Sequence, residues 1–158
     1  MKSIVTYFSA SGNTAHVANR LADAVGADIF EIRPAQTYSK EDLNWWEKDS
    51  RSTVEMNDLN SRPEIAKQRD NMGEYDVVYV GFPIWWNAAP RIVNTFLESY
   101  DFSGKIIVPF ATSGGSGVDK VNSSIRGSCA GAELKEAKLL PTDAALADLS
   151  AWAESVTK

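Results

Sequence analysis

The chain contains few of the residues that build metal sites and disulfides. Its 158 residues include one cysteine, Cys129, and one histidine, His16. A single cysteine excludes an internal disulfide and any cysteine-based metal cluster, and a single histidine removes most zinc sites and His-based catalytic triads. We therefore expect no metal site and assign no catalytic residue. The reducing cytoplasm is the default location for a chain with so little cysteine.

Positive charge and long apolar runs are also scarce. Lysine and arginine total 16 against 21 aspartate and glutamate residues, which gives a formal net charge of −5 at pH 7. Nucleic-acid binding needs a basic surface, so we expect no nucleic-acid partner. No apolar run approaches the length of a membrane span and no signal peptide is visible, so we expect no membrane contact. The modest acidity suits docking on basic proteins and would equally serve solubility.

Strand-like and helix-like spacing of apolar residues alternates along the chain. This alternation predicts a doubly wound parallel sheet of five strands between two layers of helices, within a single domain that spans residues 1–158. Nearly continuous apolar runs such as that at residues 3–8 are typical of strands covered on both faces. Strands are expected over residues 3–8, 27–32, 75–82, 105–111 and 134–140, and helices over 12–25, 89–97, 117–125 and 142–156.

Residues 34–74 interrupt this alternation. The stretch is long, polar and charged, and it carries Trp45 and Trp46. Residues 39–42 look like the start of a helix. A connection of this length inside a domain is more often a folded excursion or a functional element than a plain loop. We expect an insertion whose tryptophans cover the sheet; the alternative is that Tyr38, Trp45 or Trp46 forms part of a lid over a ligand.

Residues 9–14 connect the first predicted strand to the first predicted helix. They are Ser9, Ala10, Ser11, Gly12, Asn13 and Thr14. The free N–H groups of a helix start attract anions, three hydroxyls surround the same point, and Gly12 lets the backbone approach closely. Asn13 stands where a P-loop has lysine, and Gly-x-Gly-x-x-Gly is missing, so triphosphate and dinucleotide chemistry are not expected. We interpret this loop as a cradle for one phosphate of a bound cofactor; an ordinary capped turn is the alternative.

Two further unusual loops follow the third and fourth predicted strands. In an open sheet with strand order 2-1-3-4-5 these loops lie beside the first, at the carboxyl ends where ligands bind. A pair of tryptophans and a glycine-rich backbone wall suit a flat heteroaromatic ligand, with one tryptophan stacked on the ring and the other packed in the core. The loops comprise Pro83, Ile84, Trp85, Trp86 and Asn87, and Thr112, Ser113, Gly114, Gly115, Ser116 and Gly117.

These motifs resemble those of the flavodoxins. Residues 9–14 resemble the flavodoxin phosphate motif, (Thr/Ser)-x-(Thr/Ser)-Gly-x-Thr, and residues 81–90 resemble the Pro-Ile-Trp-Trp segment of a flavodoxin-like subfamily with an extended second connection. The resemblance implies a flavodoxin-like α/β fold of three layers with non-covalently bound FMN. It further implies that Ser9, Ser11, Asn13 and Thr14 hold the phosphate, that 83–87 contact the ribityl chain and the ring, and that 113–116 line the pyrimidine side.

By this resemblance the protein carries electrons between a reductase and an acceptor protein, as a monomer or weak dimer. The alternative is an FMN-dependent NAD(P)H:quinone-type oxidoreductase. We find no basic cluster near the loops that could hold the phosphates of a second dinucleotide, which favours the carrier. Within 83–87, Asn87 is the residue most tolerant of positive φ. Arg91 is expected in a surface ion pair or beside the flavin edge, and His16 on a solvated helix face.

Overall fold

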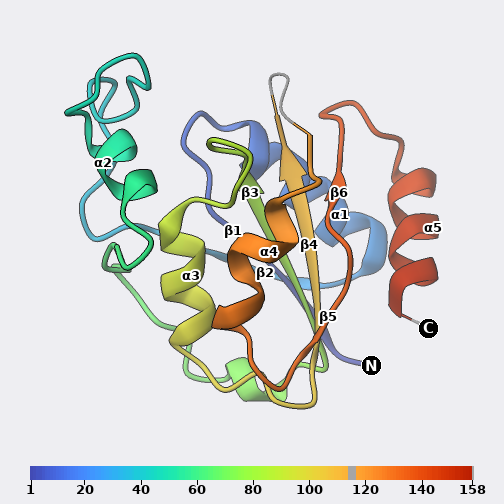
Figure 1. The fold of residues 1–158 in the computed structure, drawn as a ribbon. Helices are drawn as coiled ribbons and strands as arrows, with labels where there is room; N and C mark the ends of the chain where they lie inside the picture. The colour runs from blue at the N-terminus through green and yellow to red at the C-terminus, as the bar shows by residue number, and fades with distance from the viewer. Residues whose placement is uncertain (114–116, 158) are drawn as a thin grey trace.

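A parallel sheet forms the centre of the molecule, in a computed structural model that describes residues 1–113 and 117–157 (Figure 1). Its strand order is β2-β1-β3-β4-β5, with β6 paired to β4, so the predicted doubly wound sheet and its order are confirmed. The strands are β1 (Ser3–Tyr7), β2 (Asp28–Glu31), β3 (Val77–Pro83), β4 (Ile106–Thr112), β5 (Glu133–Leu134) and β6 (Lys138–Leu139).

Helices cover both faces of the sheet, which gives the expected three layers. Helices α1 and α5 pack on one face through apolar residues such as Leu21 and Leu149. Helices α3 and α4 pack on the other through residues such as Phe96 and Ile125. None of the helices in the described part of the chain is long and apolar enough to cross a membrane. The α-helices are α1 (Asn13–Val25), α2 (Arg51–Asn57), α3 (Arg91–Glu98), α4 (Val121–Ile125) and α5 (Leu146–Thr157), with 3-10 turns η1 (Met72–Glu74) and η2 (Arg126–Ser128).

The fifth predicted strand is divided in two. Strand β5 pairs with β4 at Ile106 and Ile107, and β6 pairs with β4 at Phe110 and Ala111. Pro109 lies between these two stretches and has no N–H to offer a neighbouring strand, so the edge ladder breaks beside it. On its other side β4 pairs with β3 without interruption. The expectation of one continuous strand over 134–140 is therefore wrong.

Within the insertion, residues 34–74, the helix forms later than expected. Ser39 and Asp42 exchange hydrogen bonds of 2.9 and 3.1 Å, as at a helix start, but the chain continues as turns. The helix of this region is α2, which begins after Ser50, whose side chain accepts a hydrogen bond from the backbone of Thr53. Figure 1 shows α2 beside α3 and far from α5.

The two tryptophans of the insertion do not cover the sheet. Trp45 is 59% exposed and Trp46 is 78% exposed, and their rings stack on each other with centroids 4.0 Å apart. The expectation that they pack over the sheet is therefore wrong. Tyr38 is the aromatic residue of the insertion that reaches the core.

Candidate functional site

A cavity of about 610 Å³ opens where β1, β3 and β4 end. Its volume lies in the range of small-molecule sites, and β1 and β3 form the switch point of the strand order. All three loops that the sequence singled out contribute to it. Residues 139–143, which begin at the last residue of β6, form a further wall that we did not expect. The lining residues are Ser11, Asn13, Pro83, Ile84, Trp85, Thr112, Ser113, Leu139, Leu140, Pro141, Thr142 and Asp143.

The first loop, residues 9–14, opens α1 through Gly12 at φ 95°, a conformation that favours glycine. The Ser9 hydroxyl accepts hydrogen bonds from the backbone of Gly12 at 3.0 Å and of Ala15 at 3.2 Å. The N–H groups of Asn13 and Thr14 lie in the first helical turn and have no intrahelical carbonyl to bind. Ser9, Ala10, Gly12 and Thr14 belong to the loop but do not line the cavity.

Thr14 links the first loop to the third. Its side chain is buried, and its hydroxyl shares a hydrogen bond of 2.8 Å with the hydroxyl of Thr112. The backbone N–H of Ile84 donates to the carbonyl of Thr112 at 3.0 Å, which joins the second loop to the third. The third loop continues through Ser113, which lines the cavity. The predicted site residues Gly114, Gly115 and Ser116 lie outside the described residues.

The second loop, residues 83–87, makes a two-residue reverse turn that closes at Ala88. Trp85 and Ala88 exchange backbone hydrogen bonds of 2.9 and 3.0 Å. The two residues between them have positive φ, 50° at Trp86 and 64° at Asn87. The expected tolerance of Asn87 is confirmed, whereas a tryptophan in this conformation is uncommon. Strained backbone of this kind persists at functional loops when the surrounding structure fixes it.

The turn sends its tryptophans in different directions. Trp85 packs edge-on against Phe8 and Tyr38, with ring centroids 5.7 and 5.5 Å away, and lines the 610 Å³ cavity. Trp86 is 44% exposed and, with Asn87, lines a different cavity. Of the five loop residues assigned to one ligand, Pro83, Ile84 and Trp85 therefore meet at the first cavity.

Tyr38 anchors the insertion against Trp85. Its phenol is buried and donates a hydrogen bond of 2.5 Å to Glu55, which also accepts one of 2.9 Å from Arg51. The Arg51 guanidinium lies 3.8 Å from the Tyr38 ring centroid. Burial and the hydrogen bond to the Glu55 carboxylate raise the pKa of Tyr38. Tyr38 thus supports the aromatic wall of the cavity from behind.

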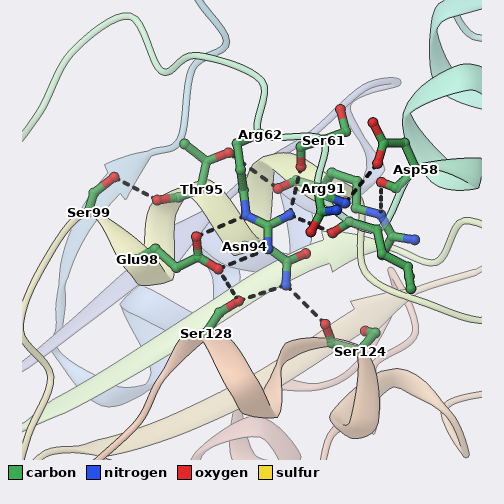
Figure 2. A network of polar contacts seen from close by, with 12 residues as sticks. Asp58, Ser61, Arg62, Arg91, Asn94, Thr95, Glu98, Ser99, Ser124 and Ser128 are labelled. Atoms are coloured by element: carbon green, nitrogen blue, oxygen red, sulfur yellow. Dashed lines mark hydrogen bonds and ion pairs between the residues drawn. The ribbon is translucent and has the colours of Figure 1, made fainter.

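Arg91 is not a surface residue. It is 6% exposed, and its guanidinium donates to the carbonyls of Met56 at 2.8 Å and Asp58 at 3.3 Å (Figure 2). Burial and the nearby Arg62 lower the pKa of Arg91. The expected surface ion pair is therefore wrong: Arg91 holds the C-terminal end of α2 onto the first turn of α3. His16 is exposed, as expected.

A second cavity, of about 500 Å³, lies on the far side of the Trp86–Asn87 turn. Three basic side chains line it, Arg62 from the insertion, Arg91 from α3 and Lys120 from before α4. The sequence did not indicate that three basic side chains lie beside the second loop. These residues are far apart in sequence and come together because the insertion folds back onto α3.

The flavodoxin family model matches residues 2–156, and the chain belongs to this family. Two solved structures share nearly half its sequence. A predicted flavoprotein from Bacteroides eggerthii DSM 20697 is 45% identical, with a TM-score of 0.94 over 99% of this chain and 98% of its own. A second, from Bacteroides uniformis ATCC 8492, is 44% identical, with a TM-score of 0.90 over 97% of each chain.

A more distant structure has the same fold. The flavoprotein from Lactobacillus acidophilus NCFM, solved in complex with FMN, is 17% identical, with a TM-score of 0.77 over 99% of both chains. A comparison of the sequence with curated proteins gives no match.

Proposed function

We propose that this chain binds FMN non-covalently in the 610 Å³ cavity and carries electrons between a reductase and an acceptor protein. One observation carries the proposal: three loops far apart in sequence converge there, one with helix-start donors and one with an aromatic wall. The FMN complex of the Lactobacillus acidophilus flavoprotein, which has this fold, supports the choice of cofactor. We also assign the chain to the flavodoxin-like subfamily with a Pro-Ile-Trp-Trp loop, and to the cytoplasm.

The residues of the cavity fit a monophosphate on an aromatic cofactor. Ser11 and Asn13 would hold the phosphate together with the N–H groups that open α1. The loop contains no lysine or arginine, so the phosphate would keep its charge there. Trp85 and the segment 139–143 would flank the ring. The bound flavin supplies the redox chemistry, and the protein binds it, orients it and tunes its potential.

The second cavity favours one alternative, an FMN-dependent NAD(P)H:quinone-type oxidoreductase, because an enzyme needs a second binding site beside the ring. For the carrier we expect fast reduction by a flavodoxin reductase with a basic docking face, at a rate that falls as salt rises. We expect negligible reduction by NADH or NADPH alone. Stopped-flow mixing of the FMN-loaded protein with each nucleotide, with and without reductase, decides between them. Rapid bleaching of the flavin band by a nucleotide alone would show that the protein is the oxidoreductase and not the electron carrier.

A further inference from the structure

The second cavity is separate from the proposed flavin site. It lies between α3, α4 and the outer side of the Trp86–Asn87 turn, and none of the described residues lines both cavities. Its volume of about 500 Å³ falls within the range of small-molecule sites. The second loop is therefore a wall between two cavities, with Trp85 on one side and Trp86 on the other.

Most of the polar groups around this cavity are already paired. Arg62 and Glu98 form a bidentate ion pair of 2.9 and 3.0 Å, and Ser128 donates to the same carboxylate at 2.6 Å (Figure 2). The remaining amino group of Arg62 donates to two backbone carbonyls. Arg62 and Glu98 therefore neutralise each other, and these contacts occupy four of the five N–H donors of Arg62.

Two cations at the cavity lack a carboxylate partner. Neither Arg91 nor Lys120 forms an ion pair with any residue that the structure describes. Arg91 is 6% exposed, and its Nη1 makes no hydrogen bond to the described residues, whereas its Nε and Nη2 bind carbonyls. In a chain of net charge −5, this local excess of positive charge marks a place for an anion.

A buried hydrogen-bond acceptor, the side-chain oxygen of Asn94, also lies at this cavity. Asn94, 4% exposed, also lines the cavity; its amide nitrogen donates to Ser124 and Ser128, both at 2.9 Å, but its Oδ1 has no partner among the described residues. Arg91 and Asn94 thus each keep one unused polar atom. Both sit on α3, near the half-exposed ring of Trp86.

We propose that this cavity binds a small molecule with an anionic head group, a carboxylate or a phosphate, held by Arg91 Nη1 and the Lys120 ammonium, with its apolar body against Trp86. The anion would relieve the repulsion between Arg62 and Arg91. Because Trp86 follows Trp85 in the loop that walls the first cavity, the bound molecule would lie beside the flavin. That last step rests on the proposed function, whereas anion binding itself does not.

The test uses benzoate and phenyl phosphate as probes and benzyl alcohol as the neutral control, titrated into both the FMN-loaded and the FMN-free protein. The readout is the NMR signal of the Trp86 indole N–H, assigned with Trp86→Phe. We expect saturable binding of at least one anionic probe in both forms, and no saturation by benzyl alcohol. The preferred probe identifies the head group. Lys120→Gln should weaken binding about tenfold, since charge-assisted contacts are the stronger ones.

A matched charge change elsewhere serves as the control. Lys67→Gln removes the same charge from an exposed residue beside β2, at the opposite edge of the sheet, and should leave binding unchanged. Equal weakening by both variants, or no saturable binding of either probe, would overturn the proposal. Displacement of the probe by FMN would overturn it as well, because it would place the anion in the flavin cavity. If the protein binds no FMN, the titration of the FMN-free protein still tests this site alone.

Discussion

Replacing Tyr38 by phenylalanine removes one oxygen atom from the contact that holds the insertion against the second loop. In the wild type this phenol, 8% exposed, donates to Glu55, which is 9% exposed and bound on its other oxygen by Arg51. The substitution keeps the ring contacts with Phe8 and Trp85. It therefore isolates one hydrogen bond to a buried carboxylate.

The expected cost follows from that geometry. A hydrogen bond to a charged group contributes about 1.5–3 kcal/mol, and the Glu55 carboxylate would lose one donor with little water to replace it. We expect Tyr38→Phe to lower the free energy of unfolding by about this amount. The stability of the wild type should also fall as the pH rises above 10, because the pKa of Tyr38 is raised in the folded state and the unfolded tyrosine loses its proton first. Above pH 10, the free energy of unfolding of Tyr38→Phe should fall less than that of the wild type.

Urea unfolding of the cofactor-free protein, followed by circular dichroism, measures both effects. Tyr79→Phe is the matched control for the free energy of unfolding at pH 7, because Tyr79 is 3% exposed and its hydroxyl makes no hydrogen bond with the described residues. We expect a change below about 0.5 kcal/mol for the control. Equal changes for the two variants would refute the anchoring role of the phenol. A loss of stability above pH 10 that is as large in Tyr38→Phe as in the wild type would also refute it.

Two further changes test the sheet and the rim of the second cavity. Gly81→Ala should lower the free energy of unfolding by about 1–3 kcal/mol in the same urea assay, because the added Cβ would lie 2.2 Å from the buried ring of Phe110; an unchanged midpoint would show that the ring moves freely. Glu98→Gln should cost about 1 kcal/mol or less at pH 7, since its ion pair with Arg62 is partly exposed. The difference in free energy of unfolding between Glu98→Gln and the wild type should become smaller as the pH falls below 4.5. The reason is that Arg62 holds the pKa of Glu98 below that value, and protonation of Glu98 removes the ion pair. A constant difference in free energy of unfolding from pH 7 to pH 3 would contradict this.

The sheet could be predicted because its strands carry strong local signals. The apolar runs of β1, β3 and β4 and the helical spacing in α1 predicted the central elements, and the resemblance to the flavodoxins supplied the strand order. Helix α2 was missed because it has seven residues, too few to show a helical period. Its contacts with Tyr38 and Arg91 come from distant parts of the chain, and tertiary contacts decide such short helices.

The site was predictable to the extent that a topological rule locates it. Parallel strands bring their carboxyl ends to one edge, and the three loops indeed meet there. The wall at 139–143 was missed because it begins at the end of β6, a strand of two residues that gives almost no signal. The second cavity was missed for a different reason. Arg62 and Glu98 are 36 residues apart, and no local sequence pattern predicts that the polar insertion packs against α3.

The central claim is that the first cavity holds the phosphate of FMN, and competing titrations of the cofactor-free protein with FMN and riboflavin test it most directly. Ser11 and Asn13 line this cavity and, in this account, would supply at least two contacts to the phosphate, so FMN should bind about 100-fold more tightly than riboflavin. Asn13→Ala should reduce that preference about tenfold, whereas His16→Ala, an exposed change on the same helix, should leave it intact. Equal affinities for FMN and riboflavin in the wild type would contradict the account.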